Sequence, residues 1–193
     1  MRLHEIERGD SLRNRLLIRF ISVVSGSRLP DAARVAFYHR DFAGEVFGAW
    51  TQHAMRGPST WTVGERELMA AMVATWNSST FCIGAHSATA VREMNRELAR
   101  DALSDYHTAP ISEPLRATLA FLEKMTRYPG QLTGADAQLA FAANVTRQQL
   151  LDAAAIATVF NVIARYADAL DFAIPSAAEF DKAARMLLKR GYA

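Results

Sequence analysis

The sequence has 193 residues, of which 50% are hydrophobic and 22% are charged, with a formal net charge of +2 at pH 7. This length is enough for one domain, spanning residues 1–193, with a substantial hydrophobic core. The small positive charge argues against a partner that is nucleic acid or an anionic membrane. A single cysteine excludes an internal disulfide framework and is typical of a reducing compartment.

The sequence shows no sign of export or of a membrane anchor. Its first ten residues, M-R-L-H-E-I-E-R-G-D, carry charges of both signs and lack the apolar region of a signal peptide. The longest apolar run, Ala153 to Ile163, is short and is broken by Thr158 and Asn161, which favours a buried helix over a membrane span. We therefore expect a cytoplasmic protein.

Apolar residues at helical spacing, together with capping residues, predict helices along the whole chain. The expected helices cover residues 10–24, 32–55 with a break near Asp41, 62–76, 79–100, 113–127, 133–143, 146–170 and 176–189. Residues 101–110, with His107, are expected to be a connection. No segment alternates between apolar and polar residues as a strand does, so the predicted fold class is all-α.

The stretch from Thr62 to His86 predicts a pair of helices with a turn between them. Thr62 and Glu65 form a capping-box pair that begins the first helix, and a polar break at residues 75–79 ends it. A cap at Ser78 or Ser79 would place Cys82 near the first turn of the second helix. There, unpaired backbone N–H groups and the helix dipole favour a thiolate over a thiol.

Three residues of this stretch could form a reactive group. Counted from a turn near Asn77, Glu67 lies about ten residues back and His86 about nine forward, so both lie roughly 13–15 Å from the turn in an antiparallel pair. Glu67 could then hold the imidazole of His86, with Cys82 one turn away on the same face, as in a general base with its nucleophile. The spacing equally fits a buried apolar cysteine, a hydrogen-bonded core histidine and a capping or surface glutamate.

The segment E-R-E-L-M-A-A-M-V-A-T-W-N-S-S-T-F-C-I-G-A-H-S resembles the signature of the alkylhydroperoxidase-D-like and carboxymuconolactone decarboxylase superfamily. Its redox members have a glutamate on one helix and then Asn-x-Cys-x-x-Cys-x-x-x-His opening the next. The segments F-L-E-K-M-T-R-Y-P-G-Q-L-T and F-N-V-I-A-R-Y-A-D-A-L are also similar, so that the resemblance covers about residues 30–180. It implies a helical bundle with a central antiparallel hairpin, assembled as a trimer, a hexamer or possibly a dimer.

One position departs from the redox signature. Glu67, Cys82 and His86 match its glutamate, second cysteine and histidine, but Ser79 stands in place of the first cysteine. An internal disulfide between the two positions is therefore impossible. If a peroxide oxidised Cys82 to a sulfenic acid, the resolving thiol would have to come from another protein or a small molecule.

The leading functional hypothesis is a thiol-dependent, antioxidant peroxidase-like oxidoreductase that reduces a hydroperoxide or another small substrate. Glu67 would orient His86, His86 would take the proton of Cys82, and the hydroxyl of Ser79 would donate a hydrogen bond. Two alternatives remain open: a carboxymuconolactone-decarboxylase-like lyase without thiol chemistry, and a non-catalytic helical oligomer.

We expect no cofactor and no metal. The chain lacks both phosphate-binding glycine motifs, G-x-x-x-x-G-K-[ST] and G-x-G-x-x-G. No H-E-x-x-H motif occurs among the five histidines, which are His4, His39, His53, His86 and His107. The long apolar helix carries Asn161, Arg165, Tyr166 and Asp168, and one or two of these could face the Cys82 pocket, although partners for helix ends are the more common use.

Overall fold

The computed structural model describes residues 1–26, 28–38 and 40–192, and none of these residues forms a β-strand. The predicted all-α fold class is confirmed. In chain order the elements are α1 (His4–Arg8), α2 (Leu12–Ser25), α3 (Asp31–Tyr38), the π-helix η1 (Arg40–Gly44), α4 (Glu45–Arg56), α5 (Val63–Trp76), α6 (Thr80–Glu93), α7 (Arg96–Asp105), α8 (Glu113–Arg127), the 3-10 helix η2 (Pro129–Gln131), α9 (Gly134–Ala142), α10 (Arg147–Ala169) and α11 (Ala177–Arg190).

Capping residues set most helix starts where the sequence predicts them. Thr62 and Glu65 form a complete capping box at the start of α5, and Thr146 with Gln149 does the same for α10. The Ser11 hydroxyl accepts the Asn14 N–H at the start of α2. The expected break near Asp41 is present as η1, between α3 and α4, although His39 lies outside the described residues.

One predicted boundary is wrong. The helix expected to reach about Arg100 ends at Glu93, and α7 then occupies part of the expected connection at residues 101–110. The cause is Asn95, whose side-chain oxygen accepts the N–H groups of Glu97 and Leu98 and so begins a new helix.

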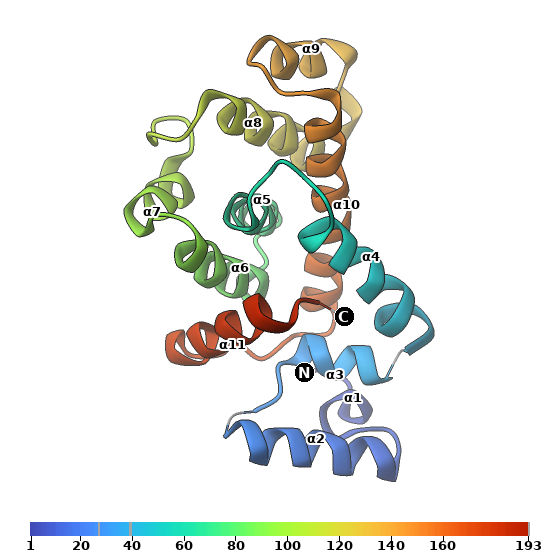
Figure 1. Cartoon of the computed structure of the whole chain (residues 1–193). Helices are drawn as coiled ribbons and strands as arrows, with labels where there is room; N and C mark the ends of the chain where they lie inside the picture. The colour runs from blue at the N-terminus through green and yellow to red at the C-terminus, as the bar shows by residue number, and fades with distance from the viewer. Residues whose placement is uncertain (27, 39, 193) are drawn as a thin grey trace.

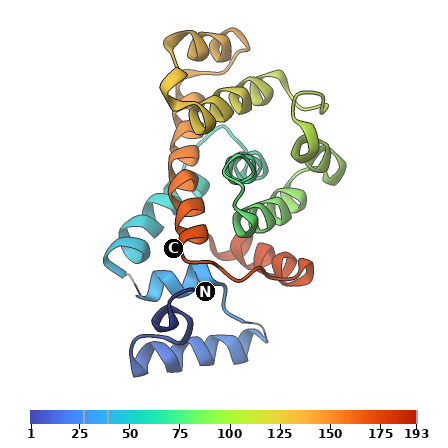
Figure 2. The same ribbon diagram turned by 180° about the vertical axis from the view of Figure 1, so that it is seen from behind.

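Helix α5 is the centre of the molecule. Figure 1 shows it end-on, with α4, α6, α7, α8 and α10 around it. Residues 66–74 are all buried, as expected for a helix that is covered on every side. Helix α10 is long and apolar enough by length and composition to cross a membrane, yet it packs against α4, α5 and α8 with eight buried residues, as a core helix does. Figure 2 shows α10 from behind, along the length of the bundle.

Helices α5 and α6 form the expected antiparallel hairpin. Its turn consists of Asn77, Ser78 and Ser79, and Ser78 has a left-handed backbone with φ of 59°. The N–H of Ser79 donates to the carbonyl of Ala74 at 3.0 Å, which closes the turn. The hairpin therefore places the first turn of α6 beside the last turn of α5.

Helix α11 lies across α6 because a glycine leaves room for an aromatic ring. A Cβ atom at Gly84 would lie 2.4 Å from the Phe180 ring. Phe180 also packs edge-on against Phe81, and Arg92 pairs with Asp181 at 2.5 Å. This contact fixes where the residues that follow α11 reach the bundle.

We expect Gly84→Ala to lower the free energy of unfolding by about 1–2 kcal/mol, because the cost of overpacking exceeds the gain in helix propensity. Urea denaturation followed by circular dichroism measures it. Gly134→Ala, at a site with no atom within 4 Å, is the control and should be neutral or slightly stabilising. Equal stability of Gly84→Ala and wild type would contradict the close packing of α11 on α6.

Candidate active site

The hairpin brings Glu67 and His86 together, as the spacing predicts. Glu67 Oε2 and His86 Nδ1 are 2.7 Å apart, and both side chains are buried. The His86 ring also packs edge-on against Phe160 of α10, with ring centroids 4.3 Å apart. An acid from α5 and an imidazole from α6 thus form one buried pair held by a third helix.

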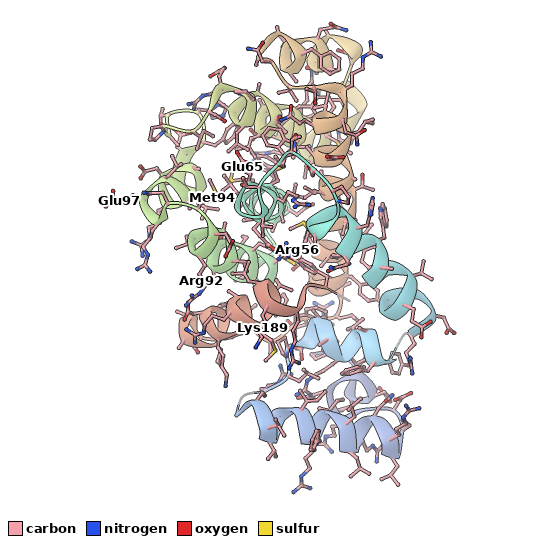
Figure 3. All side chains as sticks on the ribbon, in the orientation of Figure 1. Arg56, Glu65, Arg92, Met94, Glu97 and Lys189 are labelled. Carbon is pink, nitrogen blue, oxygen red and sulfur yellow. The ribbon has the colours of Figure 1, made fainter. Side chains whose placement is uncertain are left out.

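Two further residues contact Glu67, and neither is predicted by the sequence analysis. Arg56 Nη2, from the last turn of α4, donates to Glu67 Oε1 at 2.6 Å. The hydroxyl of Tyr192, which follows α11, donates to the same oxygen at 2.8 Å. Figure 3 shows Arg56 at the end of α4, beside the central helix. Each residue is more than ten positions from Glu67 in sequence and belongs to no local motif, so only the tertiary fold identifies them.

The surroundings of Glu67 keep its carboxylate ionised. Burial opposes the charge, but the hydrogen bond with His86, the charges of His86 and Arg56, and the hydrogen bond from Arg56 outweigh it and lower the pKa of Glu67. An ionised Oε2 can only accept, so His86 Nδ1 carries the proton and donates it. In a neutral ring, the other nitrogen, Nε2, is then the acceptor.

Cys82 lies where the sequence places it, in the first turn of α6, but its ionisation was predicted wrongly. The side chain is 1% exposed and packs in an apolar cluster with Ala74, Phe81 and Phe172. Burial raises the pKa of the Cys82 thiol to about 11, a hydrogen bond with Ser79 opposes this, and the Asp168 carboxylate adds to it. Desolvation therefore outweighs the helix dipole, and the resting group is a thiol.

Ser79 is the N-cap residue of α6, yet its side chain makes no capping hydrogen bond. Its hydroxyl instead donates to Asp168 Oδ1 of α10 at 2.8 Å. Asp168 is thus one polar residue of the long helix that does reach the surroundings of Cys82. Asn161 and Arg165 contact the hairpin turn, where both hydrogen-bond with Asn77.

An open depression of about 320 Å³ lies over this end of the hairpin. It is lined by Thr80, Phe81, Ala167, Asp168, Asp171, Phe172 and Ile174. Its lining thus includes both residues that directly precede Cys82 and the acid that binds Ser79. Within the described residues Cys82 has no hydrogen bond with His86, so a proton can pass between them only when the sulfur or the ring moves, or through a bridging water.

The site has donors where a metal would need ligands. Glu67 Oε1 already accepts from Arg56 and Tyr192, and a cation there would meet the guanidinium. Among the residues that the structure describes, no three His, Cys, Asp or Glu side chains gather in one place. His53 and His107 lie on α4 and in the loop after α7, and His39 is outside the described residues.

No protein-family model matches the sequence, and no curated protein matches it. Solved structures do match. An uncharacterized peroxidase-related protein from Silicibacter sp. TM1040 superposes with a TM-score of 0.76 at 22% identity over 93% of each chain. An alkylhydroperoxidase AhpD core protein from Ralstonia eutropha JMP134, also peroxidase-related, gives 0.73 at 23% over 90% of each chain.

A third similar structure is the debrominase Bmp8, in a variant with one cysteine replaced by alanine and in complex with 2,3,4-tribromopyrrole. It superposes with a TM-score of 0.70 at 20% identity, covering 94% of this chain and 92% of that one. All three identities are below 25%, so these likenesses establish the fold. The expected alkylhydroperoxidase-D-like bundle is confirmed.

We expect Glu67→Gln to lower the free energy of unfolding at pH 7 by about 3–5 kcal/mol, because Arg56 and His86 would lose a buried anionic partner. The pKa of Glu67 is lower in the folded protein than in the unfolded chain, so the ionised carboxylate stabilises the folded protein. This stabilisation is complete above the unfolded-state pKa of about 4.3 and is lost as the pH falls through the folded-state pKa. Urea unfolding at pH 7 and below pH 5 should show this acid-side loss in wild type and less of it in Glu67→Gln. Glu93→Gln, at an exposed position of α6, is the control and should be as stable as wild type. A Glu67→Gln variant as stable as wild type at pH 7 would refute the expectation.

We expect the alkylation rate of Cys82 in the folded protein to keep rising through pH 10, in line with a pKa of about 11. Asp168→Asn should react several-fold faster at pH 8, because a negative charge near the sulfur is removed. Stopped-flow reaction with methyl methanethiosulfonate measures both, and Asp171→Asn is the matched control. A rate that levels off near pH 8.5, where an ordinary thiol titrates, would contradict the burial of the sulfur.

Proposed function

We propose that this chain, whose fold is that of the AhpD-like peroxidase-related proteins, is a thiol-dependent oxidoreductase that reduces hydroperoxides at Cys82. The observation that carries the proposal is the buried hydrogen bond between Glu67 Oε2 and His86 Nδ1, 2.7 Å long, with Cys82 one helical turn before His86. An acid–imidazole pair that serves a thiol is the arrangement that activates a nucleophile.

The first step is removal of the thiol proton. Because Cys82 rests as a thiol, His86 Nε2 takes its proton as the peroxide approaches, through a bridging water or after the sulfur or the ring has moved, and Glu67 stabilises the imidazolium that forms. Arg56 holds the other oxygen of Glu67, so the carboxylate keeps its orientation during the transfer. We propose the depression over Phe81 and Asp168 as the entry for the peroxide.

The second step transfers one oxygen atom. The Cys82 sulfur attacks the distal peroxide oxygen, an S–O bond forms and the O–O bond breaks. His86 returns its proton to the leaving alkoxide, which departs as an alcohol. Sulfur is oxidised by two electrons to a sulfenic acid, and the peroxide is reduced by the same two electrons.

The third step requires a thiol from another molecule, since Cys82 is the only cysteine in the chain. That thiol attacks the sulfenic sulfur, releases water and forms a mixed disulfide, which a second external thiol then reduces. Ser79 cannot take the place of a resolving cysteine. Its hydroxyl proton goes to Asp168 at rest, and in this proposal the Ser79 hydroxyl hydrogen-bonds with the Cys82 sulfur during the reaction.

One observation favours a second candidate, a non-catalytic helical oligomer. Cys82 is 1% exposed and its pKa is raised, as in a structural cysteine.

The lyase alternative would use an arginine to bind a lactone acid, but Arg56, which lies in the site, is already paired with Glu67. The oxidation experiment below separates the leading proposal from both.

We also propose that the protein is a homo-oligomer. Helix α2 lies at the end of the molecule away from α9, and several of its large apolar side chains are exposed: Leu12, Leu16, Phe20, Val23 and Val24. Apolar surface of this kind on a soluble chain marks an interaction site. A second copy of the chain is the partner that we expect.

Mass spectrometry of the intact protein after limiting hydroperoxide, with and without a sulfenic-acid trap, tests the proposed activity. We expect one added oxygen on Cys82, trapped as sulfenic acid, and no addition in Cys82→Ala. His86→Ala should lower the oxidation rate by about 10²–10⁴-fold if His86 is the general base. His107→Ala, in an exposed loop, is the control for loss of a histidine.

The substrate panel should include 2,3,4-tribromopyrrole, since a debrominase of the same fold binds it. Conversion of the bromopyrrole without oxidation by hydroperoxides would replace the peroxidase proposal with a dehalogenation at the same cysteine. A Cys82 that neither oxidises nor alkylates in the folded protein would favour the non-catalytic oligomer. Turnover of a lactone acid at an undiminished rate by Cys82→Ser would favour the lyase.

A further inference from the structure

Tyr192 reaches the acid of the site from outside the hairpin. It follows Gly191, the C-cap residue of α11, whose φ of 76° turns the chain back toward α4. The Tyr192 N–H donates to Gln52 Oε1 of α4 at 2.6 Å. The end of the Gln52 side chain also lies against Gly191, where a Cβ atom would be 2.4 Å from Gln52 Oε1. The backbone that leads into Tyr192 is therefore held against α4 by Gln52.

The Tyr192 side chain meets every member of the buried acid–base group. Its hydroxyl donates to Glu67 Oε1 at 2.8 Å and lies 3.4 Å from His86 Nδ1. The Arg56 guanidinium lies over its ring, 5.0 Å from the ring centroid. The ring is also parallel to the His86 imidazole within 14°, at a centroid distance of 6.3 Å. Such a set of contacts is more than packing requires.

These contacts divide the two oxygens of Glu67 between different tasks. Oε1 accepts from Arg56 and Tyr192, and Oε2 is left to His86. If Tyr192 did not donate, Oε1 would have one donor fewer, and the fully buried carboxylate could rotate or take up a proton. A protonated or rotated Glu67 would no longer hold the Nδ1 proton of His86 in place.

We propose that Tyr192 is a positioning residue of this site, which holds Glu67 Oε1 so that Oε2 faces His86. This inference rests on the proposed function only for its catalytic consequence, because the contacts exist whether or not Cys82 reacts with peroxides. Tyr192 acts through Glu67, and the structure shows no direct contact between it and Cys82 among the described residues.

The test is the titration of the Glu67 carboxyl, followed by NMR of protein labelled with ¹³C at the glutamate carboxyl carbon and assigned with Glu67→Gln. Tyr192→Phe keeps the ring and removes only the hydroxyl. We expect its Glu67 midpoint to lie about one pH unit or more above that of wild type, because a donor to a charged group is lost. Tyr128→Phe, at an exposed tyrosine, is the control and should titrate as wild type.

A Glu67 midpoint unchanged in Tyr192→Phe would overturn the inference, including the case in which only the melting temperature changes. The rate of Cys82 oxidation by hydroperoxide against pH is the second readout, and its acid limb should move upward by the same amount. If wild-type Cys82 does not oxidise while the Glu67 midpoint still moves, Tyr192 positions Glu67 and the proposed function alone fails.

Discussion

A carboxylate with no exposed surface organises this structure. Glu67 lies fully buried in the second turn of the central helix, where an isolated charge would be very costly, so the fold must supply partners for both of its oxygens. Those partners are Arg56 from α4, His86 from α6 and Tyr192 from the segment after α11. Three parts of the chain are thus tied to one side chain, and the candidate site and the packing of the bundle cannot be changed independently.

The sequence was enough to predict the hairpin and the meeting of its two polar residues. Capping pairs such as Thr62 with Glu65 act over three residues, so they can be recognised without the fold. The distances of Glu67 and His86 from the turn near Asn77 follow from the constant rise per residue of a helix, once that turn is known. Asn95 shows the limit of such reasoning, because an apolar pattern that continues past a cap hides the end of a helix.

The rest of the site depends on contacts between segments that are distant in sequence. Tyr192 and Arg56 reach Glu67 only because α11 packs on α6 and α4 packs against α5, and no periodicity near either residue indicates this. The ionisation of Cys82 could not be predicted for a similar reason. The helix dipole can be inferred from local sequence, whereas burial depends on Phe81, Phe172 and other residues that close over the sulfur.

If Cys82 is the reactive group, the absence of a second cysteine from the chain has a kinetic consequence. In a protein with two neighbouring cysteines, an oxidised sulfur is captured by its own chain, and the capture is first-order. Here the capture would be second-order, so the lifetime of an oxidised molecule would depend on the concentration of thiols around it. A lone reactive cysteine would thus make the protein's turnover responsive to the redox state of its surroundings, with no additional binding site.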